Sequence, residues 1–452
     1  MKSLMRNIFC SATLMGIGLA AGAQGAVADA PARVTSSRVA PSAQVAGTIA
    51  ANGYYFSDKQ IDEKDLKSKE VSKEINAPKG ADIYIENASR GIVIKTWDQS
   101  KVKVTTTVYY DGESKLTDEE WLERVNLSLK TLGSSVKIKS GSPNGNGAFT
   151  LIGGQGYSYN TNGGTAIFNS TGQNIGSRSN IKRIVTITVP SGSKLDIESK
   201  YADVQLPAGI GDVNVDIQNG NLEADNLGKL VLRSRYSNAN VGDVKSAELE
   251  FNNGRFSARN IDDLDAESKY STIEMAAAKK VVIRSTNDEY EIEEAGEVSG
   301  HKNYGNLRIT KLNNSIELDG ANADVKVRNV GPSVSLIKID NRYADVRIPL
   351  RSVKDYAVEF SGAYSSVYGN FEKVPVTEKE KEKTAAGSST PAPSVPTDNA
   401  IAVTGHPFRL AAGSTFSRSG EGNGPSRFTA TVGSGKGLKV AMNCMNCTVD
   451  FK

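Results

Sequence analysis

The sequence predicts an all-β fold, a single-stranded parallel β-solenoid of short irregular coils of about 17–21 residues each, with one short helix near its N-terminal end. Three observations predict this fold. A short unit recurs along the chain at a nearly constant spacing, apolar residues alternate within each unit, and no unit carries enough apolar side chains to fold alone. We therefore expect the units to stack as successive coils.

The repeat is clearest as a column of Tyr and Asn residues between positions 201 and 364. Successive members are 17 or 18 residues apart up to position 322 and 21 residues apart after it. Self-similarity at a fixed short period is the sequence signature of stacked repeats. In order, this Tyr/Asn column consists of Tyr201, Asn219, Tyr236, Asn253, Tyr270, Asn287, Tyr304, Asn322, Tyr343 and Tyr364.

Apolar residues within each unit show strand alternation interrupted by corners. Counted from Asn219, they stand at Leu222 and Ala224 and again at Leu230 and Leu232, and the same offsets recur in later units. Burying about five such side chains stabilises one unit by roughly 2 kcal/mol each. Ordering about 17 residues costs at least roughly 1 kcal/mol per residue in backbone entropy alone. A unit is therefore stable only when it is stacked on its neighbours.

The N-terminus predicts export. Lys2 and Arg6 form a basic region, residues 8–19 an apolar region and residues 21–23 a small-residue cleavage site, so we expect residues 1–23 to be a signal peptide. No later stretch has the roughly 20 apolar residues of a membrane span. We therefore expect an exported mature chain without a transmembrane segment, in the periplasm, at the cell surface or secreted.

The Tyr/Asn column has a structural and a functional interpretation. In the structural one it is a corner ladder, where Asn tolerates a left-handed backbone and each Tyr fills the space beside the smaller Asn. In the functional one it is an aromatic stripe that binds a sugar polymer or another envelope component. Basic residues precede four of the Tyr residues, at Lys200, Arg235, Lys269 and Arg342. The candidate binding residues, called the Tyr stripe below, are Tyr201, Tyr236, Tyr270, Tyr304, Tyr343 and Tyr364.

Two cysteines remain after the signal peptide, Cys444 and Cys447. A close, even pair in an oxidising compartment indicates a disulfide, and two reduced structural thiols are the second interpretation. A metal site would need four ligands, and neither a second pair nor a nearby histidine is present in the sequence. A redox motif would need a βαβ setting that the pattern does not predict. We expect neither a metal nor a cofactor.

The remaining segments are assigned from their composition. Residues 24–73 are expected to be a flexible N-terminal segment, and residues 74–375 to form the β-solenoid. A Gly/Asn-rich loop at 141–180 interrupts the solenoid, either as a disordered insertion or as a functional contact loop. A Pro-rich charged linker follows at 376–400, and C-terminal strands at 401–452 complete the solenoid.

One helix is expected, from Thr117 to about Arg124. Thr117 and Glu120 form a capping box, and Leu116 with Trp121 forms the hydrophobic staple around it. We expect this helix to cap the end of the solenoid.

Two stretches of the sequence resemble a known family. The short strands of residues 83–104, with Gly91-Ile92-Val93-Ile94, resemble the opening of the bacterial putative adhesin β-solenoid domain family, an exported domain of unknown function. Residues 185–192, followed by repeated short strands, are similar to the middle of that domain. The resemblance covers roughly residues 75–375 and the last 40 or so. It implies the fold and an exported location, and it brings no catalytic residues.

These observations favour a non-enzymatic, exported, adhesin-like or scaffolding protein of the bacterial cell envelope. Its partner would be a glycan or a protein of the envelope or of a host surface. The alternatives are a polysaccharide-acting β-helix enzyme and a periplasmic sensor or assembly factor. An enzyme would need paired carboxylates on one face, whereas Asp262, Asp263 and Asp265 have the pattern of turn residues and Glu291, Glu293 and Glu294 that of a solvated face. The formal net charge of +3 argues against nucleic acid as a partner.

Overall fold

The computed structural model describes residues 66–141, 150–152, 155–157, 165–178, 183–376 and 427–452. The predicted signal peptide, residues 24–65, the predicted linker from residue 377 to 400 and residues 401–426 lie outside the described residues. Across the described ranges the secondary structure is β-strand with one helix, α1 (Asp118–Arg124). The all-β prediction is confirmed.

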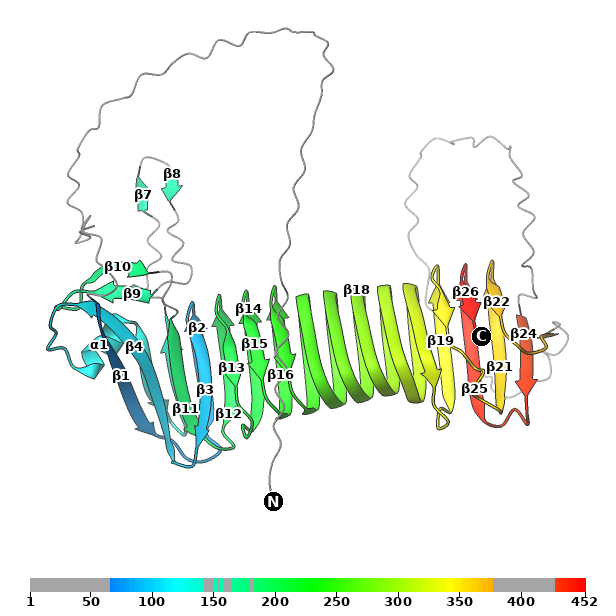
Figure 1. The fold of residues 1–452 in the computed structure, drawn as a ribbon, viewed down its shortest axis with the longest axis horizontal. Helices are drawn as coiled ribbons and strands as arrows, with labels where there is room; N and C mark the ends of the chain where they lie inside the picture. The colour runs from blue at the N-terminus through cyan, green and yellow to red at the C-terminus, as the bar shows by residue number, and fades with distance from the viewer. Residues whose placement is uncertain (1–65, 142–149, 153–154, 158–164, 179–182, 377–426) are drawn as a thin grey trace, which may run out of the picture. The chain divides into compact units, whose positions relative to one another are not determined.

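Parallel strand pairs at a constant sequence offset form the middle of the chain (Figure 1). Ile197 lies opposite Val215, Val215 opposite Leu232, and Leu232 opposite Leu249. The strand β18 is continuous in its hydrogen bonding and winds through several units. The strands of this region are β12 (Lys194–Lys200), β13 (Val204–Leu206), β14 (Asp212–Gln218), β15 (Asn221–Ala224), β16 (Leu227–Arg235), β17 (Asn238–Val241), β18 (Val244–Val330), β19 (Leu336–Arg342) and β20 (Val346–Arg347).

Every second side chain of these strands points into one continuous core. In β14, Val213, Val215 and Ile217 are buried while the residues between them are half-buried or exposed. Because the register keeps apolar residues opposite apolar residues, each core side chain contacts its counterpart in the next unit. The alternation within each unit therefore builds the core.

The N-terminal part adds antiparallel pairs to the parallel ones. The strand β2 lies between β6 and β12 in parallel, whereas β4 pairs antiparallel with both β1 and β11. The strand β3 pairs in parallel with β11 and β13. These strands are β1 (Leu66–Asn76), β2 (Asp82–Ala88), β3 (Gly91–Trp97), β4 (Lys101–Asp111), β5 (Leu127–Leu132), β6 (Ser135–Ser140) and β11 (Ile184–Pro190).

The strand β1 corrects the predicted boundary at residue 74. It begins at Leu66 and pairs with β4 along its whole length, so the end of the segment predicted to be flexible is ordered. Val71 is fully buried, and Lys69 pairs with Asp118 of α1 at 2.8 Å. A strand that buries few apolar side chains and carries many charges belongs at the edge of a sheet, which is why the composition of this stretch concealed it.

The helix α1 is confirmed within one residue of the predicted bounds. The Thr117 hydroxyl accepts the Glu120 backbone N–H at 3.3 Å, and the Glu120 carboxylate accepts the Thr117 N–H at 2.7 Å. Trp121 is fully buried, with its ring centroid 5.4 Å from that of Tyr110 and 5.5 Å from that of Phe168. The helix is thereby fixed against β1 and β4.

The predicted loop at 141–180 contains strands, so the expectation of an irregular loop is wrong for residues 165–178. The strand β9 (Thr165–Phe168) pairs antiparallel with β10 (Asn174–Arg178) and in parallel with the end of β4. Ile167 and Phe168 are buried. Two apolar residues in a Gly-, Asn- and Ser-rich stretch are too few for a periodic signal. A second hairpin joins β7 (Thr150–Ile152) and β8 (Gln155–Tyr157).

The C-terminal strands are interleaved rather than stacked in chain order. The strand β25 lies between β19 and β21 and pairs in parallel with both, and β26 likewise lies between β20 and β22. The strand β24 pairs antiparallel with β21 and with β23. These strands are β21 (Tyr356–Ala363), β22 (Ser366–Tyr368), β23 (Val374–Pro375), β24 (Arg427–Val432), β25 (Leu438–Met445) and β26 (Thr448–Asp450).

Candidate functional site

The Tyr/Asn column forms one corner of the stacked units. Each of its ten residues has a backbone φ between 53° and 60°, in the left-handed region. The backbone N–H of Tyr201 donates to the Gln218 carbonyl of the next unit at 2.8 Å, and that of Asn219 donates to the Arg235 carbonyl at 3.1 Å. The hydrogen bonds between units therefore continue around the corner, and each column residue is held in the same conformation.

The column alternates without a break in space, although it does not in sequence. Tyr343 and Tyr364 follow one another along the chain, but Asn446 lies between them, with φ 55°. The N–H of Tyr343 donates to the Met445 carbonyl at 2.9 Å, and the N–H of Asn446 donates to the Ala363 carbonyl at 2.9 Å. From Tyr201 to Tyr364 the corner consequently reads Tyr, Asn, Tyr, Asn through every unit.

The Tyr side chains of this corner face solvent. The exposed fractions of the six residues of the Tyr stripe run from 50% for Tyr304 to 88% for Tyr364, with Tyr201, Tyr236 and Tyr270 between 61% and 64%. The structure thus brings the predicted binding residues into one row on one corner, with their rings outside the core.

Packing does not explain why Tyr occupies these positions. A left-handed backbone costs an L-residue roughly 1–2 kcal/mol, and Gly and Asn are the residues that accept it most readily. A Tyr with more than half its surface exposed recovers little of that cost by burial. Asn fills the alternate positions of the same corner with the same φ, so the fold itself does not require an aromatic ring there.

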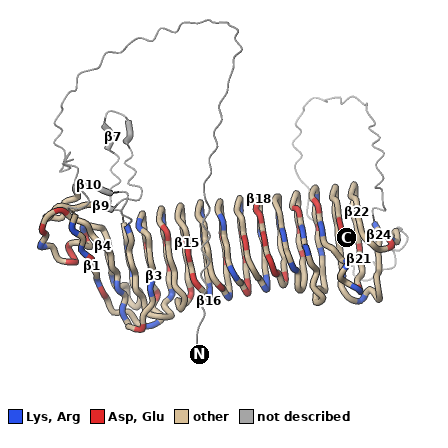
Figure 2. Tube along the Cα trace, in the orientation of Figure 1, with Lys and Arg blue, Asp and Glu red and all other residues tan. Residues whose placement is uncertain are grey.

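Most of the basic residues beside the Tyr stripe are neutralised by carboxylates. Lys200 lies 2.6 Å from Glu198, and this hydrogen bond raises the pKa of the lysine. Arg235 lies 3.1 Å from Asp216. Lys269 is likewise paired with a neighbouring glutamate at 3.5 Å. Figure 2 shows basic and acidic positions interspersed along the stacked units. The stripe is therefore an aromatic surface rather than a cationic one.

A buried charged cluster lies inside the corner, and the sequence analysis missed it. The Asp288 carboxylate is fully buried and accepts four hydrogen bonds. Two come from hydroxyls and two from backbone N–H groups, so each donor compensates part of the cost of burying the charge. The donors are Ser268 Oγ at 2.7 Å, Ser285 Oγ at 2.7 Å, the Ser271 N–H at 2.7 Å and the Thr286 N–H at 3.0 Å.

Lys302 is the cation of this cluster. Its ammonium donates to Ser285 Oγ at 3.2 Å and to the backbone carbonyls of Asp288 at 2.8 Å and Tyr304 at 3.3 Å. Ser285 therefore links the two charges, because it donates to Asp288 and accepts from Lys302. Burial lowers the pKa of Lys302 to about 8 and raises the pKa of Tyr290, whose ring lies 5.2 Å from the ammonium.

The cluster is structural rather than catalytic. Asp288 and Lys302 are both 0% exposed, so no substrate reaches either side chain. A comparison of the units could have indicated the site, because Asp288 stands where the equivalent positions of other units hold Gly220, Gly254, Ser237 and Ser271. A charged residue at such a position requires local compensation.

The two predicted disulfide cysteines flank Asn446 and are joined in the structure. Cys444 is fully buried and Cys447 is nearly so. Their places relative to the column residue match those of Ser234 and Ser237 relative to Tyr236. The disulfide thus occupies interior positions of the corner, in the unit inserted between β19 and β21 rather than in a terminal one. Its burial keeps it from the exchange chemistry of exposed redox disulfides.

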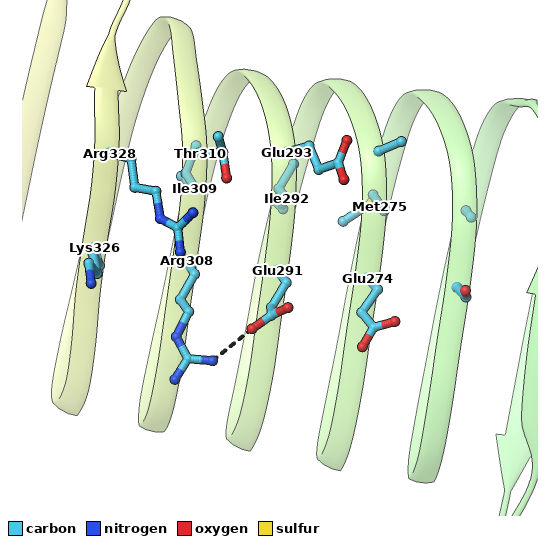
Figure 3. A pocket seen from close by; sticks show the side chains of 13 residues that line it. Glu274, Met275, Glu291, Ile292, Glu293, Arg308, Ile309, Thr310, Lys326 and Arg328 are labelled. Atoms are coloured by element: carbon cyan, nitrogen blue, oxygen red, sulfur yellow. Dashed lines mark hydrogen bonds and ion pairs between the residues drawn. The ribbon is translucent and has the colours of Figure 1, made fainter. Parts of the chain in front are cut away.

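The carboxylates considered for an enzyme do not form a catalytic pair. Asp262 pairs with Lys279 at 2.8 Å, and Asp265 forms an ion pair with Arg284. Glu291 is the one that lines a hollow, of about 330 Å³, and it is paired there (Figure 3). Within the described ranges no group of His, Cys, Asp or Glu side chains could hold a metal ion, and no helix is long and apolar enough to cross a membrane.

No protein-family model matches the chain, and no curated protein matches its sequence. Solved structures resemble it at low identity. A putative adhesin from Parabacteroides merdae is 13% identical, with a TM-score of 0.25, and the match covers 60% of this chain and 96% of that one. A putative lipid binding protein from Parabacteroides distasonis is 11% identical, with a TM-score of 0.27 and 60% and 96% coverage.

A putative cell adhesion protein from Clostridium sporogenes is 9% identical, with a TM-score of 0.15, and the match covers 85% of this chain and 99% of that one. Putative adhesins are thus found both by the resemblance in the sequence and among the similar solved structures. At these TM-scores the likeness carries no argument about binding, which rests on the residues of this chain.

Proposed function

We propose that this chain is a non-enzymatic, exported, adhesin-like protein of the bacterial cell envelope that binds an extended partner along its Tyr stripe. The observation that carries the proposal is the unbroken alternation of exposed Tyr with Asn at one corner, where Tyr is costly for the backbone and unnecessary for packing. A regular row of exposed aromatic rings is a binding surface for a partner that is itself regular.

The scaffold that we propose for this surface is a parallel β-solenoid. Parallel pairs at offsets of 17 or 18 residues support it in the middle of the chain, and the inserted strand β25 continues it toward the C-terminus. Antiparallel strands at both ends would cover edges that are otherwise free to pair with other chains. Such a scaffold fixes the spacing of anything displayed on its corner.

The spacing of the Tyr stripe suits many weak contacts with one long partner. Neighbouring units lie roughly 4.8 Å apart, so rings on alternate units lie about 10 Å apart. A glycan with a repeating surface, or an extended protein segment, would contact several rings at once, and linked weak contacts add to a high overall affinity. Tyr supplies contact area at low conformational cost because it has few rotatable bonds.

Export is supported by the sequence of residues 1–23 and by the buried disulfide. Disulfides persist in oxidising compartments outside the cytosol, and the Cys444–Cys447 bond lies in the unit that completes the Tyr/Asn column. The binding surface and the disulfide thus belong to the same part of the fold.

The proposal is tested by binding the purified protein to an array of envelope glycans, host glycans and matrix proteins, with turnover of each ligand monitored in parallel. We expect saturable binding to an extended ligand and no product. Formation of a shortened or modified ligand would contradict the proposal and favour a polysaccharide-acting enzyme. Binding restricted to a compact envelope protein would favour a sensor or assembly factor instead.

A further inference from the structure

A hollow of about 330 Å³ lies on the outward face that follows the Tyr/Asn corner. Figure 3 shows side chains from four adjacent units around it, with carboxylates on one side and basic groups on the other. The charged residues that line it are Glu274, Glu291, Glu293, Arg308, Lys326 and Arg328.

Two of the three carboxylates are already neutralised. Glu274 pairs with Arg255 at 3.2 Å, and Glu291 accepts a hydrogen bond from Arg308 at 2.7 Å. Glu293 is exposed and has no ion-pair partner among the described residues. The acidic side of the hollow therefore holds one free negative charge.

The basic side holds two free positive charges. Lys326 and Arg328 are exposed, and in the described part of the chain neither has a hydrogen-bond or ion-pair partner. Other basic residues of this face are paired, with Arg259 3.2 Å from Asp243, Lys311 3.4 Å from Glu294 and Arg347 3.3 Å from Asp450.

Lys326 and Arg328 are held on the same face by the strand itself. They are separated by Val327, which is buried together with Val325, so alternation directs both basic side chains outward. Figure 3 shows Arg328 reaching toward the unit that carries Arg308. Two unpaired cations fixed beside a third repel one another until an anion lies between them.

We propose that Lys326 and Arg328 bind an anionic group of an acidic polysaccharide, a carboxylate or a sulfate. The guanidinium presents a planar fork that matches two oxygens of such a group, and the ammonium adds a point charge beside it. The choice of a polysaccharide rests on the proposed function. Arg308 follows Tyr304 of the Tyr stripe by four residues, about 13 Å of strand, a distance that a few sugar residues span.

The carboxylates of the hollow argue against other polyanions. A membrane surface or a nucleic acid brings closely spaced negative charges against the whole face, and Glu274, Glu291 and Glu293 would repel them. A polysaccharide with one charge per repeat places its anion at the basic side and a neutral sugar at the acidic side. The charge pattern therefore favours spaced rather than dense negative charge.

The test measures binding of a galacturonate oligomer and of its methyl ester, the same sugar chain without the charge. We expect the purified protein to bind the acid, to bind the ester at least tenfold more weakly, and to lose binding of the acid as salt rises. Lys326→Gln with Arg328→Gln should weaken binding of the acid about tenfold or more. Glu293→Gln should strengthen it, because the variant removes the one free negative charge.

The matched control is Lys229→Gln with Lys245→Gln, which removes two exposed and unpaired lysines elsewhere in the stack. We expect the control to bind like the parent protein. Equal affinity for acid and ester, unchanged binding by the Lys326/Arg328 variant, or an equal loss in the control would overturn the proposal. Stronger binding to phosphatidylglycerol vesicles than to the oligomer, abolished by the same variant, would overturn it in favour of a membrane.

Variants of the Tyr stripe separate this inference from the proposed function. If Tyr270→Asn with Tyr304→Asn abolishes binding of the oligomer while the Lys326/Arg328 variant retains it, the anion site is wrong and the Tyr stripe stands. If the reverse holds, the anion site stands and the Tyr stripe is wrong as a binding surface. Loss in both variants supports both.

Discussion

Replacing Lys302 with methionine should change how the stability of the protein depends on pH. The pKa of Lys302 falls from its ordinary value of 10.5 to about 8 in the folded chain, so between these values the unfolded chain binds more protons. Below about pH 8 the folded chain carries the full penalty of a buried charge, about 3 kcal/mol from the difference in pKa. Stability should therefore rise as pH increases from about 8 toward 10.5.

The magnitude follows from the same two pKa values. Between pH 7 and pH 10 the wild-type protein should recover about 2.5 kcal/mol from this group, with a slope of no more than about 1.4 kcal/mol per pH unit. Lys302→Met has a side chain of similar length without the charge, so it should lack this rise. It leaves Ser285 and two carbonyls without a donor, which offsets its stability by a constant amount.

The assay is guanidinium chloride unfolding at pH 7, 8, 9 and 10, followed by circular dichroism, with the wild-type curve compared with that of Lys302→Met. Taking the difference between the two proteins cancels the other titrating groups, Tyr290 among them. The control is Lys280→Met, an exposed lysine, which should follow the wild type. Parallel pH profiles for wild type and Lys302→Met would refute the argument that burial governs this lysine.

Two further predictions concern the same corner. Asp288→Ala should destabilise the protein by about 3–5 kcal/mol, because it leaves the buried Lys302 uncompensated; Asp288→Ser with Lys302→Ser should recover most of this loss in the same unfolding assay, since serine occupies equivalent positions elsewhere, and a double variant less stable than Asp288→Ala would contradict the coupling. Cys444→Ser with Cys447→Ser should lower the stability of the C-terminal units by about 2 kcal/mol, the entropy of so short a loop; hydrogen exchange of β25 and β26 measures it, and unchanged protection would contradict it.

Local signals in the sequence were sufficient for the repeat and for the helix. The 17-residue spacing already contained the register, because a parallel pair at a constant offset places each column residue beside the next. The capping box at Thr117 and Glu120 depends only on residues three apart, so it could be read without the fold.

Features that depend on distant pairing could not be read in this way. Asn446 joins the column between Tyr343 and Tyr364 only because β25 inserts between β19 and β21, and nothing near Asn446 in the sequence specifies that insertion. The strand β1 was concealed for a related reason. Its alternation is weak because its partner β4 supplies most of the buried residues of the pair.

The buried cluster was missed because single departures from a repeat are ambiguous in sequence. Asp288 could have been an exposed turn residue like its neighbour Glu289, and Lys302 could have been a solvated side chain. Only the structure shows that Ser268, Ser285 and two backbone amides converge on one carboxylate. The outward direction of the Tyr stripe was likewise undecided, since both interpretations of the column fit the same spacing.

The measurement that tests the central claim most directly is a comparison of binding and stability in Tyr236→Asn with Tyr270→Asn. Asn is the residue that the corner uses at alternate positions with the same φ, so the variant removes two rings without changing the backbone that the corner requires. If the Tyr stripe is a binding surface, stability should be equal to or greater than that of the wild type, and affinity for the ligand found on the array should fall at least tenfold. Lower stability with unchanged affinity would contradict the claim and show that the rings serve packing.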